Sequence, residues 1–274
     1  MLTHDSLVVE QRALQPAKQH AVLRGWANLL RKEQGVWWGT RKWLVHLLLW
    51  PLLLNGFVVL LTFTLSKEPA LTAIEIAQQV TTLFFLISAL AAAFGAVVAT
   101  QGAVVGEKQR GTAAWIMSKP VSRRAFVLAK LVGQATGFLS LAVVLPSVIF
   151  YGQCLILWGR LPNPVAFLGS VLIVMLHEFF YLTLTLMLGT LFRGSGSVAG
   201  IALGGLLGGM FAQERLAKLA VIMPWELPDI AGLLQSPLMT EAPLRTLALP
   251  IVASAGWAAL FVAVALWRFE RAEF

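Results

Sequence analysis

The chain has 274 residues, of which 58% are hydrophobic and only 12% carry a charge. Soluble domains carry about 25% charged residues, so this composition excludes an ordinary soluble protein and predicts a polytopic membrane protein. The formal net charge of +8 is compatible with nucleic-acid binding, but the basic residues lie beside apolar segments, and positive-inside topology explains them better. The single cysteine, Cys154, excludes an intrachain disulfide.

The N-terminal region changes character near residue 22. Residues 1–21 are polar and predict a cytosolic tail. In residues 22–42, apolar side chains recur at helical spacing, while charged side chains occupy much of the remaining surface. This pattern predicts an amphipathic elbow helix lying at the membrane surface, with an ordinary soluble helix as the alternative.

Six apolar segments follow and predict transmembrane helices, since about 20 residues cross the hydrocarbon core of a bilayer. They are residues 44–65, 80–105, 131–157, 164–192, 197–211 and 247–267. Pro51 and Asn55 are expected to bend the first of them. Residues 212–250 hold two apolar runs that are too short to span, and these predict re-entrant or interfacial helices in an outer segment. The predicted fold is therefore an all-α polytopic membrane protein with six transmembrane helices.

The distribution of Lys and Arg predicts the orientation of the chain. With both termini in the cytosol, the inner segments hold 16 of the 21 Lys and Arg residues, and the outer loops hold 5. The opposite orientation would invert this bias, so the positive-inside rule favours cytosolic termini.

A charged, helix-prone segment of 24 residues, 107–130, separates the second and third apolar segments. Its one acid, Glu107, would lie in the first turn of a helix, where the dipole favours a carboxylate. Thr112 is expected to begin a short apolar helix that ends before Pro120, because proline disfavours helical geometry in the preceding residue. Ser122 can cap the next helix. Such a loop suits docking on a partner protein, although a solvated basic loop that only sets topology is the alternative.

The residues of this loop resemble those of a known family. The pattern is Glu107-x-x-x-Gly111-Thr112, then Ser-Lys-Pro-Val-Ser-Arg at residues 118–123, then Lys130 entering a span. It resembles the signature of the type-2 ABC export permeases, the membrane subunits of ATP-driven exporters. The elbow helix, the six spans and the short helices between the fifth and sixth spans are also similar to that family. The likeness covers nearly the whole chain, although only the loop is specific.

The resemblance implies that residues 22–274 form a permease domain whose coupling loop, residues 106–130, docks on a nucleotide-binding subunit. The implied coupling residues are Glu107, Gly111, Thr112, Trp115, Pro120, Arg123 and Arg124. No Gly-x-x-x-x-Gly-Lys-Ser/Thr loop occurs in the chain, so the ATPase, with its ATP and Mg²⁺, is expected in a separate polypeptide.

The same resemblance implies the assembly and its location. Two permease chains, identical or sister, would combine with two ATPase chains in the cytoplasmic membrane of a prokaryote. This chain is expected to be a transport subunit rather than an enzyme, with no cofactor, metal or nucleic acid bound to it. The few polar groups in the spans fit an amphiphile, a lipid-linked molecule, a peptide or a drug better than a highly charged solute.

His177 and Glu178 lie near the middle of the fourth span, where ionisable groups are costly and often functional. Neighbouring helical residues point about 100° apart, so these two are not expected to form one ligand pair. Tyr181 stands where a zinc-protease motif would need histidine. The alternative is a structural pair that bonds to a polar side chain of another span, namely Gln134, Asn55 or Gln101.

Two other functional classes remain open. A functional Glu178 would make the chain an ion-coupled secondary carrier, although its two halves show no repeat of the kind that carriers often have. A non-transporting immunity or scaffold protein would instead use residues 212–250 as its working surface.

The fifth span carries Gly196, Gly200, Gly204 and Gly208 at intervals of four residues. Small residues at this spacing let another helix approach closely. The stripe is interpreted as a packing face within the chain or, alternatively, as a dimer seam or a surface that slides during transport.

Overall fold

The computed structural model describes residues 23–213, 215–236 and 244–272, and every regular element in these ranges is helical. In chain order the elements are α1 (Trp26–Trp38), α2 (Lys42–Trp50), η1 (Pro51–Asn55), α3 (Gly56–Leu65), α4 (Ala73–Thr100), α5 (Val105–Gln109), α6 (Thr112–Met117), α7 (Arg123–Leu139), η2 (Ser140–Val144), α8 (Leu145–Trp158), α9 (Pro164–Leu191), α10 (Ser195–Ala212), α11 (Ala217–Ala220), η3 (Pro224–Glu226), α12 (Leu227–Leu233) and α13 (Leu244–Glu270).

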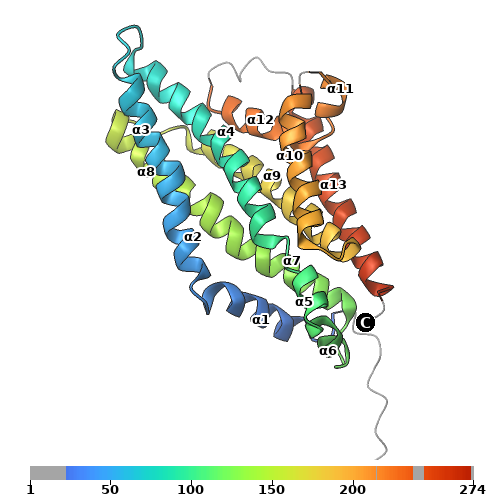
Figure 1. Cartoon of the computed structure of the whole chain (residues 1–274). Coiled ribbons are helices and arrows are strands. Elements are labelled where there is room, and N and C mark those ends of the chain that lie inside the picture. Colours follow the sequence, from blue (N-terminus) through green and yellow to red (C-terminus); the bar gives the residue numbers. More distant parts are fainter. Residues whose placement is uncertain (1–22, 214, 237–243, 273–274) are drawn as a thin grey trace, which may run out of the picture.

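Six helical runs among the described residues are long and apolar enough to cross a membrane. They are α2 to α3 with η1 between them, α4 continuing to α5, α7 to α8 with η2 between them, α9, α10 and α13. Figure 1 shows these runs side by side, with α1 across one end of the bundle. The predicted all-α fold with six spans is confirmed.

Two of the spans begin about two helical turns before their apolar segments. The second begins at Ala73 rather than at residue 80, because Thr72 and Glu75 form a capping box there. The third begins at Arg123 rather than at residue 131, because the Ser122 side chain caps it. Caps set the helix ends, whereas hydropathy marks only the part that meets lipid.

The first span is irregular where the sequence predicted a bend. Its segment η1 is π-helical and begins at Pro51, which has no backbone N–H to continue the α-helical pattern. The Asn55 Nδ2 atom donates to the Pro146 carbonyl at 3.0 Å and to Gln153 Oε1 at 2.9 Å. These bonds hold the first span against α8.

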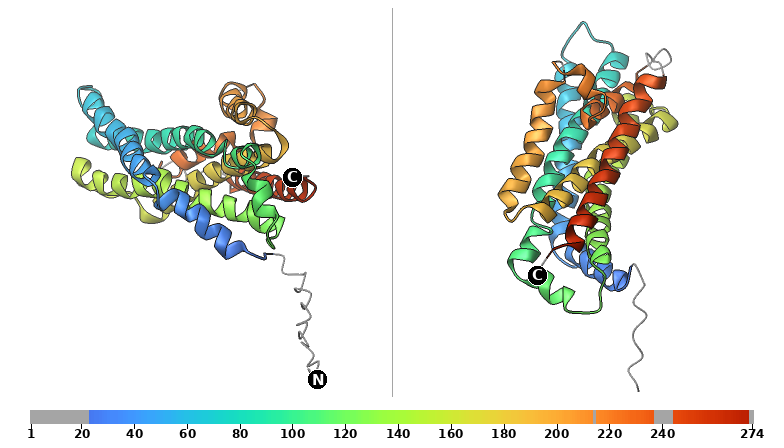
Figure 2. Two further views of the ribbon diagram at one scale, coloured as in Figure 1. Left: turned by 60° about the horizontal axis from the view of Figure 1, so that its bottom comes forward. Right: turned by 90° about the vertical axis from the view of Figure 1, so that its right-hand side faces the viewer.

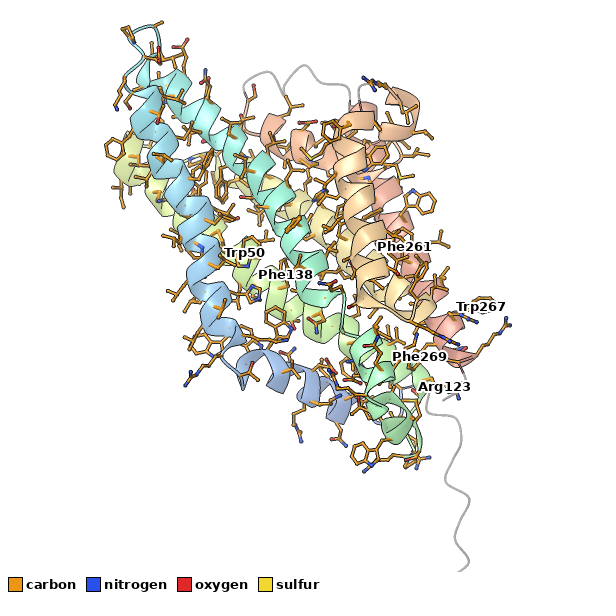
Figure 3. The ribbon with its side chains drawn as sticks, in the orientation of Figure 1. Trp50, Arg123, Phe138, Phe261, Trp267 and Phe269 are labelled. Carbon is orange, nitrogen blue, oxygen red and sulfur yellow. The ribbon has the colours of Figure 1, made fainter. Side chains whose placement is uncertain are left out.

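Aromatic rings also join the first and third spans. Trp50 of α2 and Phe138 of α7 meet edge to face, with ring centroids 5.6 Å apart (Figure 3). The Trp50 ring lies against Gly95 of α4, where a Cβ atom would overlap it.

The centre of the bundle is α9. It packs against α4, α7, α10, α12 and α13, and more of its apolar window is buried than in any other span. Burial of most of its length explains why its apolar residues are not confined to one face.

Three short helices, α11, η3 and α12, connect α10 to the part of α13 that the structure describes. The last of them, α12, packs against α4 and α9 at the end of the bundle opposite α1 (Figure 1). The prediction of short helices in residues 212–250 is confirmed for the described residues, and their re-entrant or interfacial position stays a prediction.

The predicted elbow helix over residues 22–42 is shorter in the structure. Helix α1 ends at Trp38, and a break at residues 39–41 precedes α2. Figure 1 shows α1 crossing the end of the bundle at a steep angle to α2, and α1 packs along α7. Its Trp37 side chain is 2% exposed, so this helix belongs to the folded core and is not a loosely attached segment.

Candidate functional site

Helices α5 and α6 form a projection at the same end of the bundle as α1 (Figure 1; Figure 2, right). Gly111 joins them with a φ of 70°, in the left-handed region that glycine adopts without strain. The hydroxyl of Thr112 donates to the Glu107 carbonyl at 3.1 Å and closes the turn. The predicted short helix before Pro120 is confirmed, and Gly111 and Thr112 set its start.

Glu107 lies at the centre of an ion cluster that joins α1, α5 and α7. Its Oε1 atom accepts hydrogen bonds from Lys32 Nζ at 2.6 Å and from Lys130 Nζ at 2.9 Å. Lys130 also donates to Glu33 Oε1 at 3.0 Å. The side chains of Lys130 and Glu33 are only 3% and 5% exposed, so these charges depend on one another. The ion cluster is defined as Lys32, Glu33, Glu107 and Lys130.

Two glycines of α7 bring α1 close enough to build this cluster. A Cβ atom at Gly133 would overlap the side chain of Glu33, and one at Gly137 would overlap the ring of Trp37. Trp37 Nε1 donates to Gln134 Oε1 at 3.1 Å between these two contacts. Helix α1 is therefore fixed to α7 by shape as well as by charge.

On its other side, α5 is attached to the end of α9. Lys108 Nζ donates to three backbone carbonyl oxygens there, those of Gly189 (3.2 Å), Thr190 (3.1 Å) and Phe192 (3.3 Å). Gln109 Nε2 donates to the Arg193 carbonyl at 2.8 Å. The last carbonyls of a helix have no partner within the helix, and a lysine is favoured there by the helix dipole.

The apolar residues of α6 divide between two sides. Ala113 and Ile116 are buried in the protein, at 1% and 7% exposed, whereas Trp115 is 62% exposed. Lys119 Nζ lies 3.9 Å from the centroid of the Trp115 ring, and Pro120 is exposed beside it. A partner can therefore reach Trp115 of α6, together with Lys119 and Pro120 just after the helix, but not the whole apolar run.

Arg123 and Arg124 contact the end of α13. The Arg123 guanidinium donates to the Glu270 carbonyl, and Arg124 Nε donates to the Glu270 carboxylate. Figure 3 shows Arg123 close to Phe269, whose ring stacks on Phe126 of α7 with centroids 4.9 Å apart. These two arginines therefore anchor the last span to the start of α7.

His177 and Glu178 are 1% and 0% exposed in the middle of α9. His177 Nδ1 lies 3.4 Å from Glu178 Oε1, so the two side chains do meet, because the glutamate is long enough to reach back to its neighbour. The alternative bond from this pair to Gln134, Asn55 or Gln101 is not formed among the described residues, where Glu178 Oε2 has no hydrogen-bond partner. Within the described ranges, no group of three or more His, Cys, Asp and Glu could hold a metal ion.

The glycine stripe of α10 does not pack against the part of the chain that the structure describes. A Cβ atom at Gly196, Gly200, Gly204 or Gly208 would meet no described atom within 4 Å. The interpretation of a packing face within the chain is therefore wrong for these positions. The α10 glycine that does pack internally is Gly209, where a Cβ atom would overlap the Trp225 ring.

Sequence reasoning missed Lys32, Glu33 and Lys108. A signal for the first two was present, because Lys130 enters an apolar segment, where a charge needs an opposite partner. The attachment of Lys108 to α9 had no comparable signal, because its acceptors are backbone carbonyls.

Comparison with known proteins identifies the family of the chain. The family model described as ABC-2 family transporter protein matches residues 27–274, from α1 to the end of the chain. A search of curated proteins gives no match. With its six apolar spans, the chain is a multi-pass membrane protein. It belongs to the ABC-2 transporter family and is a membrane permease of an ABC transporter, a transport subunit rather than an enzyme.

Proposed function

We propose that the chain is the membrane subunit of an ATP-driven exporter and couples ATP hydrolysis in a separate nucleotide-binding chain to substrate translocation. The observation that carries this proposal is the double attachment of α5. The ion cluster ties α5 to α1 and α7, and Lys108 ties it to the end of α9. A push on the projection would be transmitted to α1 and α7 through the ion cluster and to α9 through Lys108.

The contact with the ATPase is proposed to centre on Trp115. Its ring is 62% exposed and lies between the turn at Gly111 and the exposed Pro120. Tryptophan is enriched among the residues that dominate binding energy in protein interfaces, because its large ring fills a pocket at a small entropic cost. Lys119, whose ammonium lies over this ring, adds a positive charge to the same surface.

Glu107 has a different role in this proposal. Its residue exposure is 8%, and its Oε1 atom is bonded to Lys32 and Lys130, so little of the carboxylate is left for a partner chain. We therefore assign Glu107 to the transmission of motion rather than to the docking surface. Because separated buried ions lose mutual stabilisation without recovering full hydration, the ion cluster should move as a unit.

The assembly is proposed to contain two permease chains and two ATPase chains, with ATP and Mg²⁺ bound by the ATPases. The positive-inside bias supports cytosolic termini, which would place α5 and α6 in the cytosol of a prokaryotic cell. The glycine face of α10, which contacts nothing in the described chain, is the surface offered to the second permease.

The test is co-purification of the permease with its ATPase. Trp115→Ala should reduce the amount of ATPase recovered and the ATPase activity of the complex. The matched control is Trp267→Ala, which removes another exposed indole (52% exposed) from the end of α13 and should leave recovery unchanged. ATP-independent transport that is abolished by Glu178→Gln would contradict the proposal and favour a secondary carrier.

A further inference from the structure

A cavity of about 370 Å³ lies at the end of the bundle opposite α5 and α6. The start of α4, the end of α8, the turn leading to α9 and the end of α12 form its walls. In Figure 1 this region is near the upper edge of the bundle, around the start of α4 and α12. The volume falls within the range of small-molecule sites.

The polar chemistry of the cavity favours a negatively charged ligand. Arg160 is the one charged side chain among the described residues that line it, and it forms no ion pair within the described chain. Trp158 Nε1 is buried and has no acceptor among the described residues. Both residues line the cavity, and both groups are donors without a protein acceptor among the described residues, so an anionic oxygen is the ligand group that suits this wall.

The remaining wall of the cavity carries a group of large apolar side chains and no further charge among the described residues. Ile74, Leu161 and Leu234 line it together with the Trp158 ring, and between them lie the neutral polar residues Gln78, Thr81, Asn163, Gln235 and Ser236. Tryptophan places its ring against apolar matter and its N–H toward polar groups, as at the interface of a membrane. The arrangement therefore suits a molecule with a charged head and an apolar body.

We propose that this cavity binds an anionic amphiphile. A phosphate head group would pair with Arg160 and accept the Trp158 N–H, while the apolar body would lie against Ile74 and Leu234. Arginine matches phosphate because its planar fork donates two parallel hydrogen bonds. The proposal concerns binding alone and stands whether or not the chain couples to an ATPase.

The test measures equilibrium binding to the purified full-length chain in a non-ionic detergent. The probes are a short-chain phosphatidylglycerol, a phosphatidylcholine with the same acyl chains, and glycerol phosphate, the free anionic head. The expected order is phosphatidylglycerol first, with the other two at least several times weaker, because only the first offers both an anion and an apolar body.

Arg160→Gln should weaken phosphatidylglycerol binding roughly tenfold, the effect of losing a charge-assisted hydrogen bond. Trp158→Phe keeps the aromatic ring, removes the N–H and should weaken binding by a smaller factor. The matched control is Lys67→Gln, which removes an exposed cation outside the cavity, in the turn before α4, and should change nothing.

Arg160 is exposed in the turn between α8 and α9, so its replacement is expected to leave the fold intact, and thermal unfolding of each variant verifies this. Equal affinity of the wild type and Arg160→Gln for phosphatidylglycerol would overturn the proposal. Glycerol phosphate binding as tightly as the lipid would also overturn it, because the apolar wall would then have no role.

Discussion

Glu107 and Lys130 meet at 2.9 Å between Oε1 and Nζ, although 23 residues and the whole of α6 separate them in the chain. The same lysine reaches Glu33 of α1, and the same glutamate reaches Lys32. One pair of side chains thus joins the elbow helix, the projection and the third span. A displacement of α5 cannot leave the other two helices in place without breaking charged contacts in a poorly hydrated site.

Neutralising Glu107 tests the ion cluster. Glu107→Gln keeps the shape of the side chain but leaves Lys32 and Lys130 with less negative charge near them. The substitution should lower the free energy of unfolding by an amount that approaches the roughly 3 kcal/mol typical of breaking a buried pair. The loss is measured as a lower midpoint of thermal unfolding in detergent. Glu270→Gln is the control, because its partner Arg124 is exposed, and its effect should be much smaller. Equal effects of the two substitutions would contradict the central position of Glu107.

The two glycines of α7 give a test of the α1–α7 contact that involves no charge. Gly137→Ala places a methyl group where the Trp37 ring lies and should destabilise the protein by about 1–3 kcal/mol. Gly152→Ala, in α8, is the control because no described atom lies within 4 Å of its Cβ position. Alanine is the better helix former, so Gly152→Ala should be neutral or stabilising by up to about 1 kcal/mol. Similar losses at both positions, measured by denaturation, would refute the close approach of α1.

Lys108 should affect coupling rather than partner binding. Lys108→Met removes the donor to the last carbonyls of α9 and should cost about 1 kcal/mol of stability. The complex should still assemble, but ATP should no longer change the reactivity of a cysteine placed at Ser197 on α10, in a Cys154→Ser background. Lys119→Met should instead weaken assembly with the ATPase, because Lys119 lies on the proposed docking surface. In the complexes that still form, ATP should continue to change the reactivity of the cysteine at position 197. Loss of partner binding in Lys108→Met would contradict this division of roles.

The glycine face of α10 predicts a separable effect on assembly. Gly204→Leu fills space that no described atom of the chain occupies, so the fold should be retained. Association of two permease chains, measured by native mass spectrometry, should weaken if this face is their seam. Undiminished association of the variant would show that the seam lies elsewhere.

Local signals predicted the boundaries of α6 and the start of α7. Gly111 supplies the left-handed turn, Pro120 ends the helix region, and Ser122 caps α7, and each of these depends on a few neighbouring residues. Hydropathy predicted the six spans for a similar reason. Whether an apolar segment can cross the bilayer depends on its own length and composition, and not on its neighbours in the fold.

The ion cluster could not be predicted in the same way, because it depends on which helices touch. Glu33 lies among charged residues of α1, a pattern typical of a solvent-facing side, yet it is 4% exposed. It is buried because Gly133 lets α1 approach α7, and neither helix alone carries that information. The same applies to α10, where regular spacing singled out four glycines that touch nothing in the described chain, while Gly209, outside the stripe, is the one that packs internally.

The most direct test of the coupling account is a cross-link from α6 to the ATPase. In a Cys154→Ser background, Ser118→Cys would place the only thiol of the chain at the exposed end of α6, beside the proposed docking surface, and leave Trp115 itself in place. The account predicts that this cysteine cross-links to the ATPase chain in membranes and is protected from impermeant thiol reagents added to intact cells. Labelling from the outside, or an ATPase that binds without any cross-link to this position, would contradict it.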